Sequence, residues 1–249
     1  MKIMGIDTSA TAASISICED SKVLSEFFVN VKLTHSQTMM PMVKAALDCA
    51  VLNLSDIDVF AVANGPGSFT GLRISIAAVK GMAFAQQKPC VGISTLEAIA
   101  HNVVSVPGVI CPVMDARVKQ VYNALFQSDG RKLTRLCPDR AITIAELAEE
   151  LTSIKQSVIL VGDGANLCYH EFSGKFPHVV PAQENIRYQR ASSVCALALR
   201  EIQNCNTVSA DALGVQYLRL PQAQRERNAR LQQEQERAIK ENEHDCNRQ

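Results

Sequence analysis

A glycine-rich run at residues 64–73, Asn-Gly-Pro-Gly-Ser-Phe-Thr-Gly-Leu-Arg, is the segment of the chain best suited to chemistry. Its glycines let several backbone N–H groups converge at the start of a following helix, and such donors can hold an anion. The run lacks the Gly-Lys-Ser/Thr ending of a phosphate-binding P-loop, so it does not indicate lysine-assisted phosphate chemistry. The same pattern also suits a tight turn from strand to helix, and the residues alone favour that structural interpretation.

Histidine and cysteine, which could form other catalytic or metal sites, are dispersed along the chain. The five histidines form no His-Glu-x-x-His zinc motif, and the chain has no Gly-x-Ser-x-Gly nucleophile turn. The nine cysteines form no Cys-x-x-Cys pair. Several lie in apolar runs, where cysteine behaves as a small hydrophobic residue. We therefore expect reduced core cysteines, no metal site and no protease activity.

Patterns of apolar residues predict an α/β protein whose two halves repeat one order of elements. Each half begins with three strands and continues with a helix, a strand and a further helix. We expect two duplicated β-β-β-α-β-α subdomains, at residues 1–105 and 106–220. The predicted strands are 2–7, 13–18, 22–30, 57–63, 89–93, 109–114, 120–126, 132–136 and 157–161, and the predicted helices are 34–52, 70–87, 95–104, 143–153, 165–172, 192–203 and a short one from Ala210.

The composition is that of a globular protein without a strong overall charge. Hydrophobic residues make up 47% of the 249 residues, and 25 basic residues balance 25 acidic ones. This balance disfavours a protein that binds nucleic acid by itself. The chain lacks an apolar run of about 18 residues, so we expect a soluble cytoplasmic protein with no membrane segment. Residues 221–249 are almost entirely charged or amide, which predicts a solvated polar tail.

Six short motifs, taken in order, resemble the TsaB family of bacterial proteins, also called YeaZ. The likeness covers about residues 1–220, and its most specific part is the glycine-rich run. The resemblance implies the actin/Hsp70/sugar-kinase-like (ASKHA) fold, which agrees with the repeated order of elements. The motifs are Asp7-Thr8-Ser9, His35-Ser36-Gln37, Gly65–Arg73, Ser94-Thr95-Leu96, Asp115-Ala116-Arg117 and Gly162-Asp163-Gly164-Ala165.

The resemblance implies a non-catalytic partner subunit of TsaD, the enzyme that transfers a threonylcarbamoyl group to the adenosine next to the anticodon in tRNAs. It further implies a complex with TsaD and TsaE, contact with tRNA only through that complex, and a homodimer when TsaD is absent. The fold leaves one alternative open, an independent ATP-dependent phosphotransferase.

The paralogue TsaD differs from this chain at its metal site. TsaD binds metal through a His-x-x-x-His motif at the start of a helix, because two imidazoles four residues apart share one helix face. The resemblance places these positions at Thr95 and Ile99, and neither side chain can replace an imidazole ligand. We therefore expect neither a metal site nor catalytic residues in this chain.

The resemblance also implies the place of a nucleotide site. ATP-using members of the fold have one Asp near the end of the first strand and a second Asp, followed closely by Gly, that begins the second half. Arg117 occupies that Gly position here, and Asp7 and Asp115 could equally cap turns at strand ends. We expect no resident cofactor, with ATP or ADP only at the interface with TsaD. The candidate residues are Asp7, Thr8, Asp115, Gly162 and Gly164.

The second predicted helix, residues 70–87, is apolar on nearly all sides, so one face can cover the sheet while another still needs burial. Burial within one domain is the alternative, but the TsaB family pairs its first two helices with TsaD. Lys80 marks the wet side, so we place the sheet contact on the stripe Leu72, Ile76, Val79 and Ala83. The predicted partner interface is Met39, Met42, Val43, Arg73, Ala77, Lys80 and Phe84.

Overall fold

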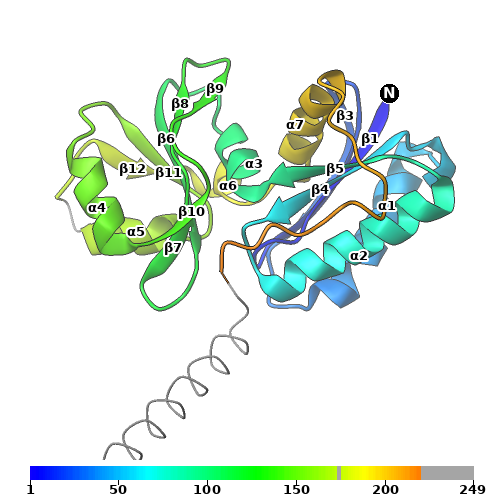
Figure 1. Ribbon diagram of the computed structural model, residues 1–249, viewed down its shortest axis with the longest axis horizontal. Helices are drawn as coiled ribbons and strands as arrows, with labels where there is room; N and C mark the ends of the chain where they lie inside the picture. Colours follow the sequence, from blue (N-terminus) through cyan, green and yellow to red (C-terminus); the bar gives the residue numbers. More distant parts are fainter. Residues whose placement is uncertain (173–174, 220–249) are drawn as a thin grey trace, which may run out of the picture. The chain divides into compact units, whose positions relative to one another are not determined.

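In the computed structural model, three strands at the start of the chain pair as an antiparallel meander (Figure 1): β1 (Lys2–Asp7), β2 (Ala13–Glu19) and β3 (Lys22–Val29). β4 (Val59–Gly65) and β5 (Cys90–Ser94) join them in parallel, giving the order β3-β2-β1-β4-β5. β4 is buried along its whole length, as expected for a parallel strand with helices on both faces. All five predicted strands are confirmed to within two residues.

Helices cover both faces of this first sheet. α1 (His35–Ala50) and α2 (Phe69–Gln86) pack on one face, and α3 (Thr95–His101) and α7 (Ala191–Gln203) lie on the other. The prediction from the sequence includes α7 in the unit at residues 106–220. The structure places it on the first sheet, because the apolar stripe of α7 packs against the apolar residues of β1, β4 and β5.

The second sheet repeats the topology of the first. Its order, β10-β7-β6-β11-β12, matches β3-β2-β1-β4-β5 strand for strand, with α4 and α5 on one face. The duplicated unit is therefore confirmed. The bounds are β6 (Gly108–Asp115), β7 (Gln120–Asn123), β10 (Arg140–Thr143), α4 (Ile144–Thr152), β11 (Val158–Val161), α5 (Ala165–Phe172), β12 (Val179–Pro181) and α6 (Glu184–Arg187).

A hairpin inserted into the second half makes two details of the prediction wrong. The predicted strand 120–126 is divided into β7 and β8 (Phe126–Ser128), because β7 pairs with the end of β6 and β8 pairs with its start. The predicted strand 132–136 is β9 (Leu133–Arg135), which pairs with β8, whereas the third strand of the repeat is β10.

Residues 208–218, which we call the C-terminal strap, return along α2 and contain one turn near Ala210. Val208 forms two backbone hydrogen bonds with Cys90 at the edge of the first sheet, at 2.8 and 2.9 Å. Ala210 and Leu213 are buried in the core beneath α2, and Gln216 N donates to Asn64 O at 2.8 Å. The predicted short helix from Ala210 is reduced to a single turn, in which Ala212 N and Leu213 N donate to Ser209 O at 3.1 and 3.2 Å, because the residues on either side bond to the sheet and to the glycine-rich run.

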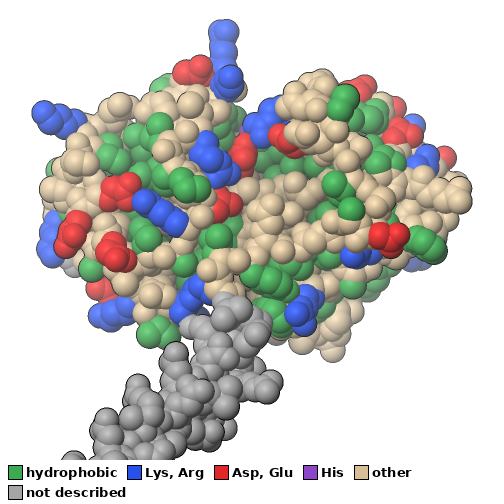
Figure 2. Space-filling model, in the orientation of Figure 1, with side chains coloured by type: hydrophobic (Ala, Val, Ile, Leu, Met, Phe, Trp, Pro, Cys, Tyr) green, Lys and Arg blue, Asp and Glu red, His purple; other side chains and the backbone are tan. Residues whose placement is uncertain are grey.

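The structure describes residues 1–172 and 175–219, and Met1–Leu218 form one unit. The predicted tail at 221–249 lies outside the described residues, and the division between residues 105 and 106 stays a prediction. Within the described part, none of the helices combines the length and the apolar character that a membrane span requires. On the face shown in Figure 2, basic and acidic side chains are interspersed, as the neutral composition predicts.

Candidate acidic site and partner face

The glycine-rich run of residues 64–73 folds as a turn that presses α2 onto the end of β1. Ser68 N donates to Ser9 O at 2.6 Å, and Thr8 Oγ1 donates to Gly71 O at 2.9 Å. A Cβ atom on Gly71 would lie 2.0 Å from Thr8 O. Close backbone approach therefore requires glycine here, as the turn interpretation expects. The Thr8 hydroxyl, a candidate for nucleotide binding, is engaged in holding this turn.

Two acidic side chains, Asp7 of β1 and Asp163 after β11, carry buried oxygens without a partner among the described residues. The Oδ1 of Asp7 accepts hydrogen bonds from Ser9 N at 2.9 Å and Ser9 Oγ at 2.6 Å, but its Oδ2 has no donor. Oδ1 of Asp163 is also without a donor. Burial raises the pKa of Asp7 to about 6 and that of Asp163 to about 7, and the charges of Asp115 and Asp7 add to the rise at Asp163.

These three carboxyls follow the ends of β1, β6 and β11, so the fold brings the predicted Asp7 and Asp115 into one electrostatic neighbourhood. Asp163 is not among the site residues predicted from the sequence. Its one sequence signal is an acidic residue between two glycines directly after an apolar strand. Its raised pKa could not be foreseen, because desolvation depends on tertiary packing.

The two candidate glycines have engaged backbone donors. Gly162 N donates to Arg187 O at 2.8 Å, and Gly164 N donates to Val113 O at 3.1 Å. Gly162 has a φ of +108°, and a Cβ atom there would lie 2.2 Å from Val113 O. These glycines therefore bring the turn close to β6, and their N–H groups are not available for a phosphate.

The turn after β6 closes on itself in the same way. Asp115 Oδ1 accepts a hydrogen bond from Arg117 N at 2.7 Å, as a turn cap does. Arg117, Val118 and Lys119 all have positive φ, between 54° and 63°, so three residues other than glycine occupy the left-handed region. In the described part of the chain, no three His, Cys, Asp or Glu side chains are grouped so that they could hold a metal ion.

The raised pKa values make the stability of the folded chain depend on pH. Between about pH 4 and pH 7, Asp7 and Asp163 ionise in the unfolded chain before they ionise in the folded one. We therefore expect the free energy of unfolding to fall as the pH rises through this range, by about 1.4 kcal/mol per unit of raised pKa. Urea unfolding at about pH 5 and about pH 8 measures the decline.

Asp7→Asn and Asp163→Asn should each reduce this decline, because the amide does not ionise. Asn can still accept the hydrogen bonds from Ser9. The exposed Asp48→Asn serves as the control and should keep the wild-type slope. An unchanged slope in both buried variants would contradict the assignment.

The start of α3, where the resemblance places the positions of the lost metal motif, is packed in the interior. Thr95 and Ile99 are fully buried. In the same first turn, Glu97 accepts hydrogen bonds from Arg135 at 3.0 Å and from Arg200 at 2.8 Å, which lowers the pKa of its carboxyl against the effect of burial. Glu97 thus joins α3 to β9 and to α7, a role that the sequence analysis missed.

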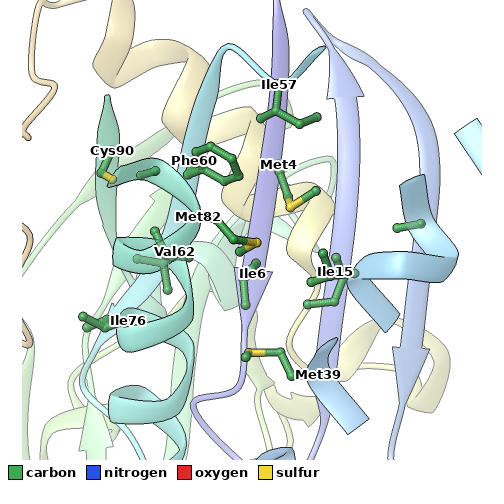
Figure 3. Packing of buried hydrophobic residues seen from close by; sticks show 14 of the residues in the cluster. Met4, Ile6, Ile15, Met39, Ile57, Phe60, Val62, Ile76, Met82 and Cys90 are labelled. Atoms are coloured by element: carbon green, nitrogen blue, oxygen red, sulfur yellow. The ribbon is translucent and has the colours of Figure 1, made fainter. Parts of the chain in front are cut away.

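The two faces of α2 are as predicted. Leu72, Ile76, Val79 and Ala83 are buried against the first sheet, and Figure 3 shows Ile76 in this core with Val62 of β4. On the opposite side Arg73 and Ala77 are exposed, Phe84 is 71% exposed, and Lys80 is half-buried. Gly81 and Ala85 are exposed as well. We call Arg73, Ala77, Lys80, Gly81, Phe84 and Ala85 the outer face of α2.

The predicted contribution of α1 to this face is wrong for three residues. Met39, Met42 and Val43 are 3–6% exposed and pack in the core between α1 and the first sheet. Figure 3 shows Met39 among Ile6 and Ile15. Their side chains are therefore not available to a partner. The exposed methionine of α1 is Met40, whose helical position is rotated by about 100° from that of Met39.

Comparisons with known proteins agree with this architecture. The family model described as "TsaD: tRNA N6-adenosine threonylcarbamoyltransferase" matches residues 23–230. The tRNA threonylcarbamoyladenosine biosynthesis protein TsaB of Bacillus subtilis is 33% identical over 167 residues, or 67% of this chain and 73% of the relative. TsaB of Escherichia coli is 32% identical over 167 residues, or 66% and 72%.

Among solved structures, a Pseudomonas aeruginosa protein described as similar to peptidase YEAZ superposes with a TM-score of 0.76 and 25% identity. The match covers 88% of this chain and 99% of that one. The predicted actin/Hsp70/sugar-kinase-like fold is confirmed.

Proposed function

The chain belongs to the TsaB proteins of the TsaD family, and on that premise we propose that it is a non-catalytic partner subunit in the synthesis of threonylcarbamoyladenosine on tRNA. Its role is to bind the TsaD transferase. We propose that TsaE belongs to the same complex and that tRNA contacts the complex and not this chain alone. Where TsaD is absent, we propose that the chain forms a homodimer. The site of action is the cytoplasm.

The observation that carries this proposal is the outer face of α2. Ala77, Gly81, Phe84 and Ala85 expose an apolar surface on a helix whose opposite stripe is buried. A helix that is apolar on both sides needs a second burial partner. The small side chains at 77, 81 and 85 lie on one side, at a spacing that lets another helix approach closely.

The second candidate function is an independent phosphotransferase, and the grouping of Asp7, Asp115 and Asp163 favours it. The residues present do not fit a resident nucleotide. The N–H groups of Gly162 and Gly164 and the Thr8 hydroxyl all donate to protein oxygens. These candidate nucleotide-binding groups therefore have no donor left for a phosphate. We propose no cofactor for this chain alone, and a nucleotide at the TsaD interface would be held mainly by groups of the partner.

Reconstitution tests the proposal. The isolated protein should neither hydrolyse ATP nor modify tRNA, while addition of TsaD, TsaE and threonylcarbamoyl-adenylate should produce modified tRNA. Omission of this chain from the mixture should abolish the product. Asp7→Asn should support modification as the wild type does. Turnover of ATP by the isolated chain that is lost in Asp7→Asn would establish the phosphotransferase instead.

A further inference from the structure

Arg73 lies on the outer face of α2, and two aromatic rings hold its guanidinium in place. The carbon atom at the centre of the guanidinium lies 3.8 Å from the centre of the Phe69 ring and 6.0 Å from that of Tyr217. Arg73 Nε donates to the Tyr217 hydroxyl at 2.9 Å, and the two rings stack at 5.1 Å. An exposed arginine normally samples many rotamers, whereas these contacts restrict Arg73 to one.

The two terminal nitrogens of this guanidinium are free to bind a further group. Within the described residues, neither Nη1 nor Nη2 of Arg73 has a hydrogen-bond or ion-pair partner. Lys80, the other charged residue of α2, differs because its Nζ donates to Asp211 O at 3.2 Å. Arg73 thus holds two free donors, Nη1 and Nη2, in a fixed position on a helix that carries two positive charges and no negative one.

A partner helix packed over Ala77 and Phe84 would also remove water from Arg73, one turn away. A desolvated guanidinium without a counter-charge is costly. The planar pair of N–H donors matches a carboxylate in a bidentate arrangement. An acidic side chain is therefore the partner group that fits this position.

We propose that Arg73 is a preorganised receptor for an Asp or Glu side chain of the partner protein, and that Tyr217 of the C-terminal strap positions it. The inference rests on the proposed function, since the partner is the TsaD transferase. The inference specifies that the contact is an ion pair between Arg73 and an acidic side chain. It also makes the C-terminal strap a part of the interface, since Tyr217 positions Arg73.

Calorimetric titration of the full-length chain with TsaD tests the contact. Arg73→Lys keeps the charge but loses the planar donor pair, and should weaken binding by roughly 10- to 100-fold. Arg131→Lys, the same change on an exposed turn between β8 and β9, should bind as the wild type does. Tyr217→Phe keeps the ring stack, removes the acceptor for Nε, and should weaken binding by a smaller factor.

A double-mutant cycle separates positioning from a general structural effect of Tyr217. In the Arg73→Gln background, Tyr217→Phe should cause no further loss, because its effect acts through the guanidinium. An equal loss in both backgrounds would overturn the positioning role. A scan of acidic residues on the helices of TsaD, each changed to Arg, should find one whose loss of binding is restored by Arg73→Glu.

Failure of the inference and failure of the proposed function give different results, because a wild-type chain that does not bind TsaD at all would refute the proposed function. If Ala77→Glu abolishes binding while Arg73→Lys and Arg73→Gln bind normally, the partner face stands and the carboxylate receptor is refuted. If Ala77→Glu also binds normally, the proposed face itself is refuted. Weaker binding of tRNA to the assembled complex, with unchanged affinity for TsaD, would assign Arg73 to a phosphate and overturn the inference.

Discussion

Ala77→Glu is expected to weaken binding to TsaD by roughly 30- to 5,000-fold without unfolding the chain. Ala77 is exposed at the centre of the outer face of α2, so the isolated fold loses no packing when a longer polar side chain is placed there. In the complex, the longer side chain is buried in the interface, and its carboxylate lies one turn from Arg73. It then either stays unpaired or occupies the guanidinium that the acidic group of the partner would bind, and we expect either result to cost about 2–5 kcal/mol. Circular dichroism melting and size-exclusion chromatography with TsaD measure the two effects separately.

The control is Ala196→Glu, which introduces the same side chain at an exposed position of α7, on the other side of the first sheet. This variant should melt and bind as the wild type does. Unfolding of Ala77→Glu would mean that the exposed and buried faces of α2 are reversed. A folded Ala77→Glu variant with normal affinity would exclude α2 from the interface.

Gly71→Ala should destabilise the folded chain by about 3 kcal/mol or more. The added methyl group would lie 2.0 Å from Thr8 O, which is backbone at the end of β1 and cannot rotate away. The start of α2 must then move off β1, and the hydrogen bond from Thr8 Oγ1 to Gly71 O is lost with it. Urea unfolding monitored by circular dichroism gives the change in free energy.

Gly81→Ala provides a matched control in the same helix. A Cβ atom at Gly81 meets no atom within 4 Å, so only the helix propensity changes. This variant should be about 0.5–1 kcal/mol more stable than the wild type. Similar unfolding energies for the two variants would show that α2 does not approach β1 as closely as described.

Much of the fold could be predicted because local periodicity records which side of an element is buried. The short apolar run of β4 indicates a strand buried on both faces, and the spacing of Leu72, Ile76, Val79 and Ala83 indicates a helix with one inward face. Lys80 similarly indicates which side of α2 faces solvent. These signals lie within a few residues of one another, so they can be seen without the rest of the chain.

The candidate site was predictable only in part. Asp7, Asp115 and the glycines of the turn after β11 stand at strand ends, where the repeated topology brings them together. The raised pKa of Asp163 and the internal use of the glycine N–H groups depend on packing that surrounds them in space. Met39 shows the same limit, because an apolar residue on α1 suits either a core or an interface.

The sequence by itself determined the α/β class, the duplicated order of elements and the inward face of α2, because short apolar runs and a period of 3.6 residues are local properties. The tertiary structure alone decided that α7 packs on the first sheet and that Tyr217 fixes Arg73, a contact across 144 residues. Both contacts form only because the fold brings segments that are far apart in the sequence next to each other. Their stability comes from burial and hydrogen bonds formed only when distant segments meet, and no pattern along the chain encodes those.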